Sequence, residues 1–129
     1  MKLLNTRLRT SAALLLSAAS IVSIGAAIAP STASATTPQA IAAQIVPASQ
    51  LASFDQIISH ESGWNVTATN ASSGAYGLGQ ALPGSKMASA GADWQTSATT
   101  QIKWALGYMD SRYGSPNAAW SFWQAHNWY

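Results

Sequence analysis

The sequence predicts an all-α fold: a small helical domain with a long glycine-rich loop after its first helix. Apolar residues recur at helical spacing in several stretches, and residues that start or stop helices bound each stretch. Residues 63–84 are polar and rich in glycine, without the alternation that marks a strand. Six tryptophans and no cysteine indicate a core built from aromatic side chains rather than disulfides.

The first helix is expected over residues 49–62, followed by a stop at Gly63. Its apolar stripe consists of Leu51, Phe54, Ile57 and Ile58. Pro83 can start a short helix that ends at Gly91, because proline is accepted in the first turn of a helix. The loop between the two helices is long enough to carry functional residues.

Two further helices are expected in the last third of the chain. Thr96 or Ser97 caps the longest one, which ends at Gly114. Its stripe consists of Ile102, Leu106, Met109 and Tyr113. Ser115 and Pro116 open the final helix, which carries Ala119, Trp120 and Trp123 on one face.

Residues 1–35 have the order of features found in a secretory signal peptide. Lys2, Arg7 and Arg9 precede an apolar run from 12 to 29, and residues 33–35 (Ala-Ser-Ala) form a small-x-small cleavage site. We therefore expect a secreted protein cut after Ala35. A retained membrane anchor is the alternative, because the apolar run approaches a spanning length, although three serines and a glycine dilute it.

Residues 36–50 are rich in alanine, proline and small polar residues, and we expect them to form a linker. Residues 51–129 then form one domain, expected to be a monomer. After residue 35, three basic residues stand against four acidic ones, which leaves a net charge of −1. This balance argues against a nucleic-acid partner, which requires a basic face.

Glu61 is the only glutamate in the chain and closes the first helix. It follows Ile58 by three residues and Ile57 by four, so it lies on the apolar side of the helix. Burial and the negative end of the helix dipole both favour its protonated form, which suits proton donation to a leaving group. The alternative is a structural buried glutamate paired with a nearby donor.

Other common catalytic chemistries lack their residues. The absence of cysteine removes cysteine-peptidase chemistry, and His60 and His126 stand apart without zinc-site spacing. No GxSxG elbow is present, so we do not expect a serine hydrolase. The carboxylate mechanism that we expect needs no metal or other cofactor. Carboxylate chemistry remains, and glycoside cleavage is its commonest form. Asp93 is then the best second carboxylate, because Asp55 and Asp110 lie on helices with exposed neighbours.

Several ordered motifs are shared with one enzyme family. Residues 61–64 read Glu-Ser-Gly-Trp, 73–80 read Ser-Gly-Ala-Tyr-Gly-Leu-Gly-Gln, and 82–87 read Leu-Pro-Gly-Ser-Lys-Met. Residues 100–104, 112–114 and 128–129 complete the set. From about Phe54 to Tyr129, the chain resembles the soluble lytic transglycosylase domain, and most closely its small secreted, wall-associated branch in Gram-positive bacteria.

This resemblance implies a lysozyme-like α fold and cleavage of the glycan strands of peptidoglycan. It implies that Glu61 is the general acid and base, and that Ser62 contacts the bound sugar. Gly77, Leu78 and Gln80 would shape the groove beside the acid. Aromatic residues expected to stack on sugar are Tyr76, Trp64 and Trp120. One departure is the segment 119–123, where the larger family has an Ala-Tyr-Asn-Ala-Gly motif and this chain has neither the asparagine nor the glycine.

We therefore expect a lytic transglycosylase that cuts between N-acetylmuramic acid and N-acetylglucosamine. The muramic 6-hydroxyl would supply the nucleophile, so one carboxylate would suffice. Two alternatives stay open. One is a hydrolytic muramidase with Asp93 as second carboxylate. The other is a non-catalytic surface protein that binds wall glycan through its aromatic residues and promotes aggregation.

Overall fold

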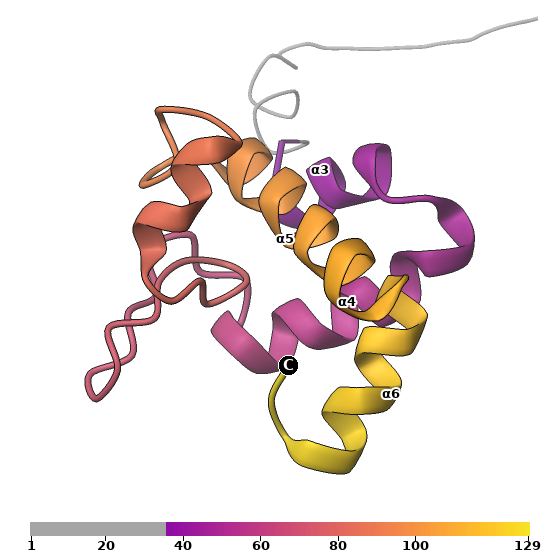
Figure 1. Cartoon of the computed structure of the whole chain (residues 1–129). Coiled ribbons are helices and arrows are strands. Elements are labelled where there is room, and N and C mark those ends of the chain that lie inside the picture. The colour runs from indigo at the N-terminus through magenta and orange to yellow at the C-terminus, as the bar shows by residue number, and fades with distance from the viewer. Residues whose placement is uncertain (1–35) are drawn as a thin grey trace, which may run out of the picture. The chain divides into compact units, whose positions relative to one another are not determined.

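The computed structural model describes residues 36–129, so the expected signal peptide lies outside the described residues. The described chain is helical: α3 (Pro38–Ile45), α4 (Ala48–Ser62), the 3₁₀ helix η2 (Gly84–Ser89), α5 (Ala98–Tyr113) and α6 (Pro116–His126). Within this part only isolated β-bridges occur, and no strand forms. The all-α class is therefore confirmed (Figure 1). None of the helices in residues 36–129 is both long and apolar enough to span a membrane.

Helix α3 occupies the segment that we expected to be a linker. The Thr37 side chain caps it by accepting a hydrogen bond from the Ala40 N–H at 3.2 Å, and Pro38 lies in its first turn. Ala42 is fully buried, and α3 packs against α4 and α5. The folded unit therefore begins at Thr37. Alanine and proline, which we interpreted as linker composition, here form a helix start and a small-residue packing face.

Helix α4 carries the predicted stripe into the core. Phe54, Ile57 and Ile58 are fully buried, and Leu51 is partly buried. The helix ends at Gly63, which adopts the left-handed conformation with φ 60°. Helix α4 packs chiefly against α6 and also against α3.

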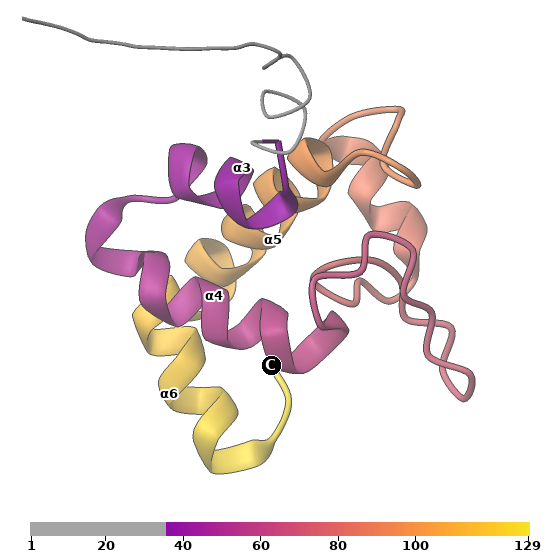
Figure 2. The ribbon, with the colours of Figure 1, turned by 180° about the vertical axis from the view of Figure 1, so that it is seen from behind.

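Helix α5 is the central helix of the domain and packs against α3, α6 and η2 (Figures 1 and 2). The Ser97 side chain caps its start by accepting from the Thr100 N–H at 3.2 Å, and Gly114 ends it with φ 95°. Ser115 caps α6 in the same way, as the sequence predicts. The side chains that α5 buries completely include Ile102, Ala105 and Met109.

The predicted glycine-rich loop is continued by η2 and the turn before α5, and together they form the loop segment 63–97, which both views show on the side of the domain away from α6 (Figures 1 and 2). One fully buried side chain of α5, Gln101, ties three parts of this loop together. Its Oε1 accepts the Leu78 N–H at 2.8 Å, and its Nε2 donates to the Val66 and Trp94 carbonyls at 3.0 and 2.8 Å. A buried amide that satisfies three backbone groups fixes their relative positions, because each group left alone would cost free energy.

Candidate active site

Glu61 lies in the last turn of α4 and meets α6. Its Oε2 accepts a hydrogen bond of 2.7 Å from the indole Nε1–H of Trp123. The contact joins residues 62 apart in the sequence, so it depends on the packing of α4 against α6. The side chain is partly buried, as its position on the apolar side of the helix predicts.

Aromatic rings pack around Trp123, the side chain that donates to this carboxyl group. Trp120 and Trp123 stack with ring centres 5.4 Å apart, one helical turn from each other. The ring of His60 lies 4.6 Å from that of Trp123 and 5.4 Å from that of Trp120. The indole of Trp123 is therefore held between neighbours while its N–H points at Glu61.

Burial raises the pKa of the Glu61 carboxyl above its ordinary value. The hydrogen bond from Trp123 and the nearby His60 act in the opposite direction, because both stabilise the ionised form. Burial has the larger influence, so the group holds its proton to a higher pH than a solvated glutamate. The predicted direction of this shift is confirmed.

The second oxygen of the Glu61 carboxyl, Oε1, has no hydrogen-bond partner in the part of the chain that the structure describes. In the same part of the chain, Oδ1 of Asp55 is the only buried side-chain nitrogen or oxygen atom that lacks a hydrogen bond. Oε1 of Glu61 is therefore open to solvent. The carboxyl thus has one oxygen positioned by Trp123 and one that can exchange a proton with a ligand.

Ser62 and Trp64, both expected to contact sugar, follow Glu61 at the helix end. The Ser62 hydroxyl donates to the Ile58 carbonyl and accepts the Trp64 N–H, each at 3.2 Å. It therefore stabilises the end of α4. Trp64 is partly buried against the core and has φ 68°, in the left-handed region that residues other than glycine seldom adopt. This strained turn sets the direction in which the chain leaves the Glu61 helix.

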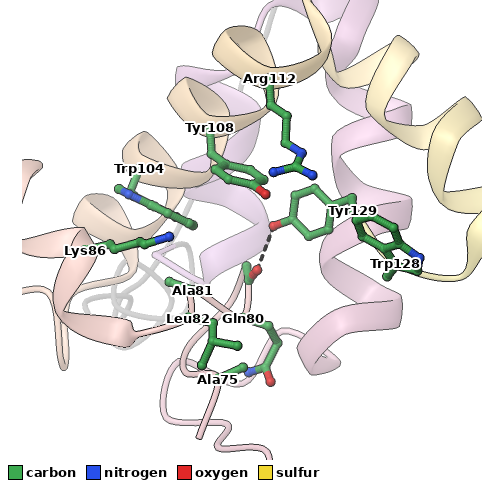
Figure 3. Close-up of a pocket in the computed structure, with 11 residues that line it drawn as sticks. Ala75, Gln80, Ala81, Leu82, Lys86, Trp104, Tyr108, Arg112, Trp128 and Tyr129 are labelled. Carbon is green, nitrogen blue, oxygen red and sulfur yellow. Dashed lines mark hydrogen bonds between the residues drawn. The ribbon is translucent and has the colours of Figure 1, made fainter. Parts of the chain in front are cut away.

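Gly77, Leu78 and Gln80 lie in the loop that Gln101 holds, and their roles differ. Leu78 is fully buried, so its side chain serves the core rather than a groove. Gly77 has φ 81°, and a Cβ there would lie 2.6 Å from Oε1 of Gln101. Gln80 has φ 54°, and its amide donates to the Ala68 and Gly77 carbonyls at 3.1 and 2.9 Å. Among the three, Gln80 alone lines a pocket with its side chain (Figure 3).

Tyr76 is directed toward the next loop segment. Its hydroxyl donates to the Gln95 carbonyl at 2.6 Å, and its ring meets the edge of Trp94 with centres 5.7 Å apart. Trp120 lies on α6 beside His60, as described above. The structure therefore places Trp120 near Glu61 through the Trp123 cluster, whereas Tyr76 belongs to a separate contact.

A pocket of about 260 Å³ opens beside the last residues of the chain. The hydroxyl of Tyr129 donates to the Gly79 carbonyl at 2.7 Å, and its ring forms one wall (Figure 3). Burial raises the pKa of Tyr129 well above its usual range, and the negative charge of Glu61 raises it further. Tyr129 therefore lines this pocket and also lies close enough to Glu61 for the carboxylate to raise its pKa.

Asp93, the candidate for a second carboxylate, has a partner at the start of α5. Its Oδ1 accepts a hydrogen bond of 2.6 Å from the Thr100 hydroxyl, and its carbonyl accepts the N–H groups of Thr96 and Ser97. These contacts belong to the turn that leads into α5. Asp110 is exposed, as its position after core-facing Met109 predicts.

Sequence reasoning missed two contacts that shape the site. It placed Trp123 on a helix face but did not identify it as the hydrogen-bond donor to Glu61. It also gave no role to Gln101, although a glutamine among the apolar residues of α5 is a signal of a buried amide. Residues 36–129 contain no group of three or more side chains placed to hold a metal ion. No protein-family model, curated protein or solved structure matches the chain.

Proposed function

We propose that this protein is a secreted, lysozyme-like lytic transglycosylase that cleaves the glycan strands of peptidoglycan, with Glu61 as acid and base. The observation that carries the proposal is the state of Glu61. Its pKa is raised by burial, one oxygen is fixed by Trp123, and the other is open to solvent. A carboxyl group in this state keeps its proton to a higher pH than a solvated glutamate and can donate it to a leaving group. The motifs around residues 61–87 support the choice of glycan as substrate.

In the proposed reaction, Glu61 gives its proton to the glycosidic oxygen between N-acetylmuramic acid and N-acetylglucosamine. The bond between that oxygen and the muramic anomeric carbon breaks. The 6-hydroxyl oxygen of the same muramic residue bonds to the anomeric carbon, and its proton passes to the Glu61 carboxylate. The products are a 1,6-anhydromuramic end and a free N-acetylglucosamine 4-hydroxyl. No water is consumed, and Glu61 returns to its protonated form.

The surroundings of Asp93 and Asp110 support transglycosylation over hydrolysis. An inverting glycosidase needs a second carboxylate at about 6.5–9.5 Å, and a retaining one needs it at about 5 Å. Asp93 is engaged with Thr100, and Asp110 is exposed on α5. A substrate that carries its own hydroxyl nucleophile requires neither, and gains from its proximity to the reacting carbon.

The test is digestion of purified peptidoglycan by the wild type and by Glu61→Gln, followed by turbidity. Glutamine keeps the size and can still accept from Trp123 but cannot deliver a proton, so we expect a loss of about 10²–10⁴-fold in rate. Asp110→Asn removes one exposed negative charge and serves as the control with full activity. Equal lysis by wild type and Glu61→Gln would contradict an acid role and favour a non-catalytic wall-binding protein.

Mass spectrometry of the released muropeptides identifies the nucleophile. Anhydromuramic ends are lighter than hydrolysed ends by one water. Hydrated ends, together with activity lost in Asp93→Asn, would establish the two-carboxylate muramidase instead.

The pH profile tests the contact with Trp123. Trp123→Phe keeps an aromatic ring but removes the N–H that stabilises the ionised carboxylate. The Glu61 pKa should rise, so the basic limb of the activity profile should move to higher pH. An unchanged basic limb would show that the indole does not set the proton affinity of Glu61.

A further inference from the structure

Residues 127–129 follow α6 and return toward α4 (Figures 1 and 2). The turn begins at Asn127, which has φ 65° and whose N–H donates to the Trp123 carbonyl at 2.6 Å. Trp123 therefore makes two contacts: its indole donates to Glu61, and its carbonyl accepts from the returning segment. The path of residues 127–129 is thus tied to the same α6 residue that positions the acid.

Tyr129 joins this returning segment to the loop. Its hydroxyl donates to the Gly79 carbonyl at 2.7 Å (Figure 3). In the described part of the chain, this is the only hydrogen bond between residues 127–129 and the loop. Gly79 lets the hydroxyl approach, because a Cβ there would lie 2.9 Å from the hydroxyl oxygen. The Tyr129 ring packs against the rings of Tyr108 and Tyr113, with centres 5.4 and 6.4 Å away.

Tyr129 also lies beside the acid. Burial and, after it, the charge of Glu61 raise the pKa of Tyr129 well above its usual range. At neutral pH the hydroxyl therefore keeps the proton that it donates to Gly79. The next residue of the loop, Gln80, lines the same pocket as the Tyr129 ring. One side chain thus lies near Glu61 and holds the backbone next to Gln80.

We propose that Tyr129 is a positioning residue for the reaction of Glu61, because its hydrogen bond to Gly79 holds the loop in a fixed place relative to the acid. This role rests on the proposed function, in which the loop and the end of α4 contact the same glycan strand. A misplacement of about 1 Å can lower a rate by about 10²-fold, so the loop must be held accurately. Tyr129 exchanges no proton with the glycan and acts only through the loop.

The first measurement follows the loop without any substrate. Tyr129→Phe keeps the ring and removes only the hydroxyl. Tyr113→Phe is the matched control, because it removes a hydroxyl from the same group of rings that bonds to Arg112 instead of the loop. The Ala81 N–H donates to a carbonyl within the loop, and we expect it to exchange about tenfold or more faster in Tyr129→Phe alone. Unchanged exchange would overturn the proposal.

The second measurement follows the cleavage of soluble, uncrosslinked wall glycan strands. Tyr129→Phe should lower kcat by about tenfold or more with little change in KM, because the strand still binds but is held less accurately against Glu61. Water should then compete better with the muramic 6-hydroxyl, so the fraction of hydrated muramic ends should rise. Loss of folded protein alone would not change that fraction. Tyr113→Phe should keep the wild-type kcat and products.

Gly79→Ala tests the same contact from the loop. Its Cβ should push the Tyr129 hydroxyl away and also lower kcat. In the double variant with Tyr129→Phe, the two losses should combine to less than their product, because both break one contact. Circular dichroism confirms that each variant is folded.

Three results would overturn the positioning role and leave the proposed function standing: wild-type kcat in Tyr129→Phe, a lower kcat with unchanged products, or a fully multiplicative loss in the double variant. A wild type that does not cleave the strands would instead contradict the proposed function, and with it any role of Tyr129 in the reaction. The exchange measurement would still decide whether Tyr129 holds the loop.

Discussion

The helices and the loop of residues 63–97 share one core but are held by different interactions. Helices α4 and α5 meet their neighbours through apolar side chains such as Phe54, Ile57 and Met109. The loop is fixed mainly by directed hydrogen bonds, of which the three made by Gln101 span the widest range of residues. Apolar contacts are many and individually weak, whereas the loop depends on a few groups with fixed geometry.

The difference matters because Glu61 and the pocket beside Tyr129 depend on different interactions. Glu61 and Trp123 both lie on helices, so their contact rests on the apolar core. Gln80 and Gly79 lie on the loop, so the pocket beside Tyr129 rests on Gln101. Damage to the core should therefore affect both sites, whereas damage to the loop should affect the pocket first.

The largest expected effect is that of Phe54→Ala. Truncating a fully buried phenylalanine removes contacts and leaves a cavity, which typically costs about 3–5 kcal/mol. We expect the helices and the loop to lose stability together in urea unfolding followed by circular dichroism. Leu82→Ala, at a side chain that is half exposed, is the control with a small effect. A loss confined to the loop would contradict a shared core.

Gln101→Ala should have the next largest effect, of about 2–3 kcal/mol. It leaves the Leu78 N–H and two carbonyls without their partner, and unpaired buried groups carry costs of this order. Hydrogen exchange should show faster exchange in residues 63–97 before the helices are affected. Gln124→Ala, at an exposed position of α6, is the control. Unchanged protection of the Leu78 amide would show that Gln101 does not hold the loop.

Gly77→Ala should destabilise the domain by about 1–2 kcal/mol, because an L-residue is strained at its φ of 81°. The new Cβ would also press on the Gln101 amide. Gly107→Ala is the matched control: its Cβ meets nothing within 4 Å, and alanine favours the helix. In the double variant with Gln101→Ala, the clash disappears. The double variant should therefore lose less stability than the two single variants lose in sum. If the two losses of stability were strictly additive, the destabilisation by Gly77→Ala would come only from backbone strain.

The smallest effect is expected for Asp55→Asn on α4. Burial raises the pKa of Asp55 above its ordinary value of 3.8, and its Oδ1 is buried without a hydrogen bond. The stability that this carboxyl contributes is present below pH 3.8 and is lost as the pH rises through its folded-state pKa. The asparagine variant should therefore melt slightly higher than the wild type at pH 7, and the gap should close toward pH 3.8.

Thermal melts across that pH range provide the measurement, with Asp110→Asn as the exposed control. A lower melting temperature for Asp55→Asn at pH 7 would mean that the ionised carboxylate is stabilised by the fold.

The sequence by itself determined α4, α5, α6 and the setting of Glu61, whereas the segment of α3 was interpreted as a linker. Caps and stops act within a few residues, so Ser97, Gly114 and Ser115 marked their helix ends directly. The spacing of Phe54, Ile57 and Ile58 identified the buried face of α4, and with it the partial burial of Glu61 and the direction of its pKa shift. These features follow from local geometry, which any fold containing the helix would share.

Only the tertiary structure decided which distant groups meet. The Trp123 donor comes to Glu61 because α4 and α6 pack together, and the same burial of side chains brings α3 into the core despite its linker-like composition. Gln101 finds its three partners, and Tyr129 meets Gly79, only once the loop has folded onto α5. Such contacts join residues far apart in the chain, and no local pattern encodes them, because their geometry is set by how whole elements pack.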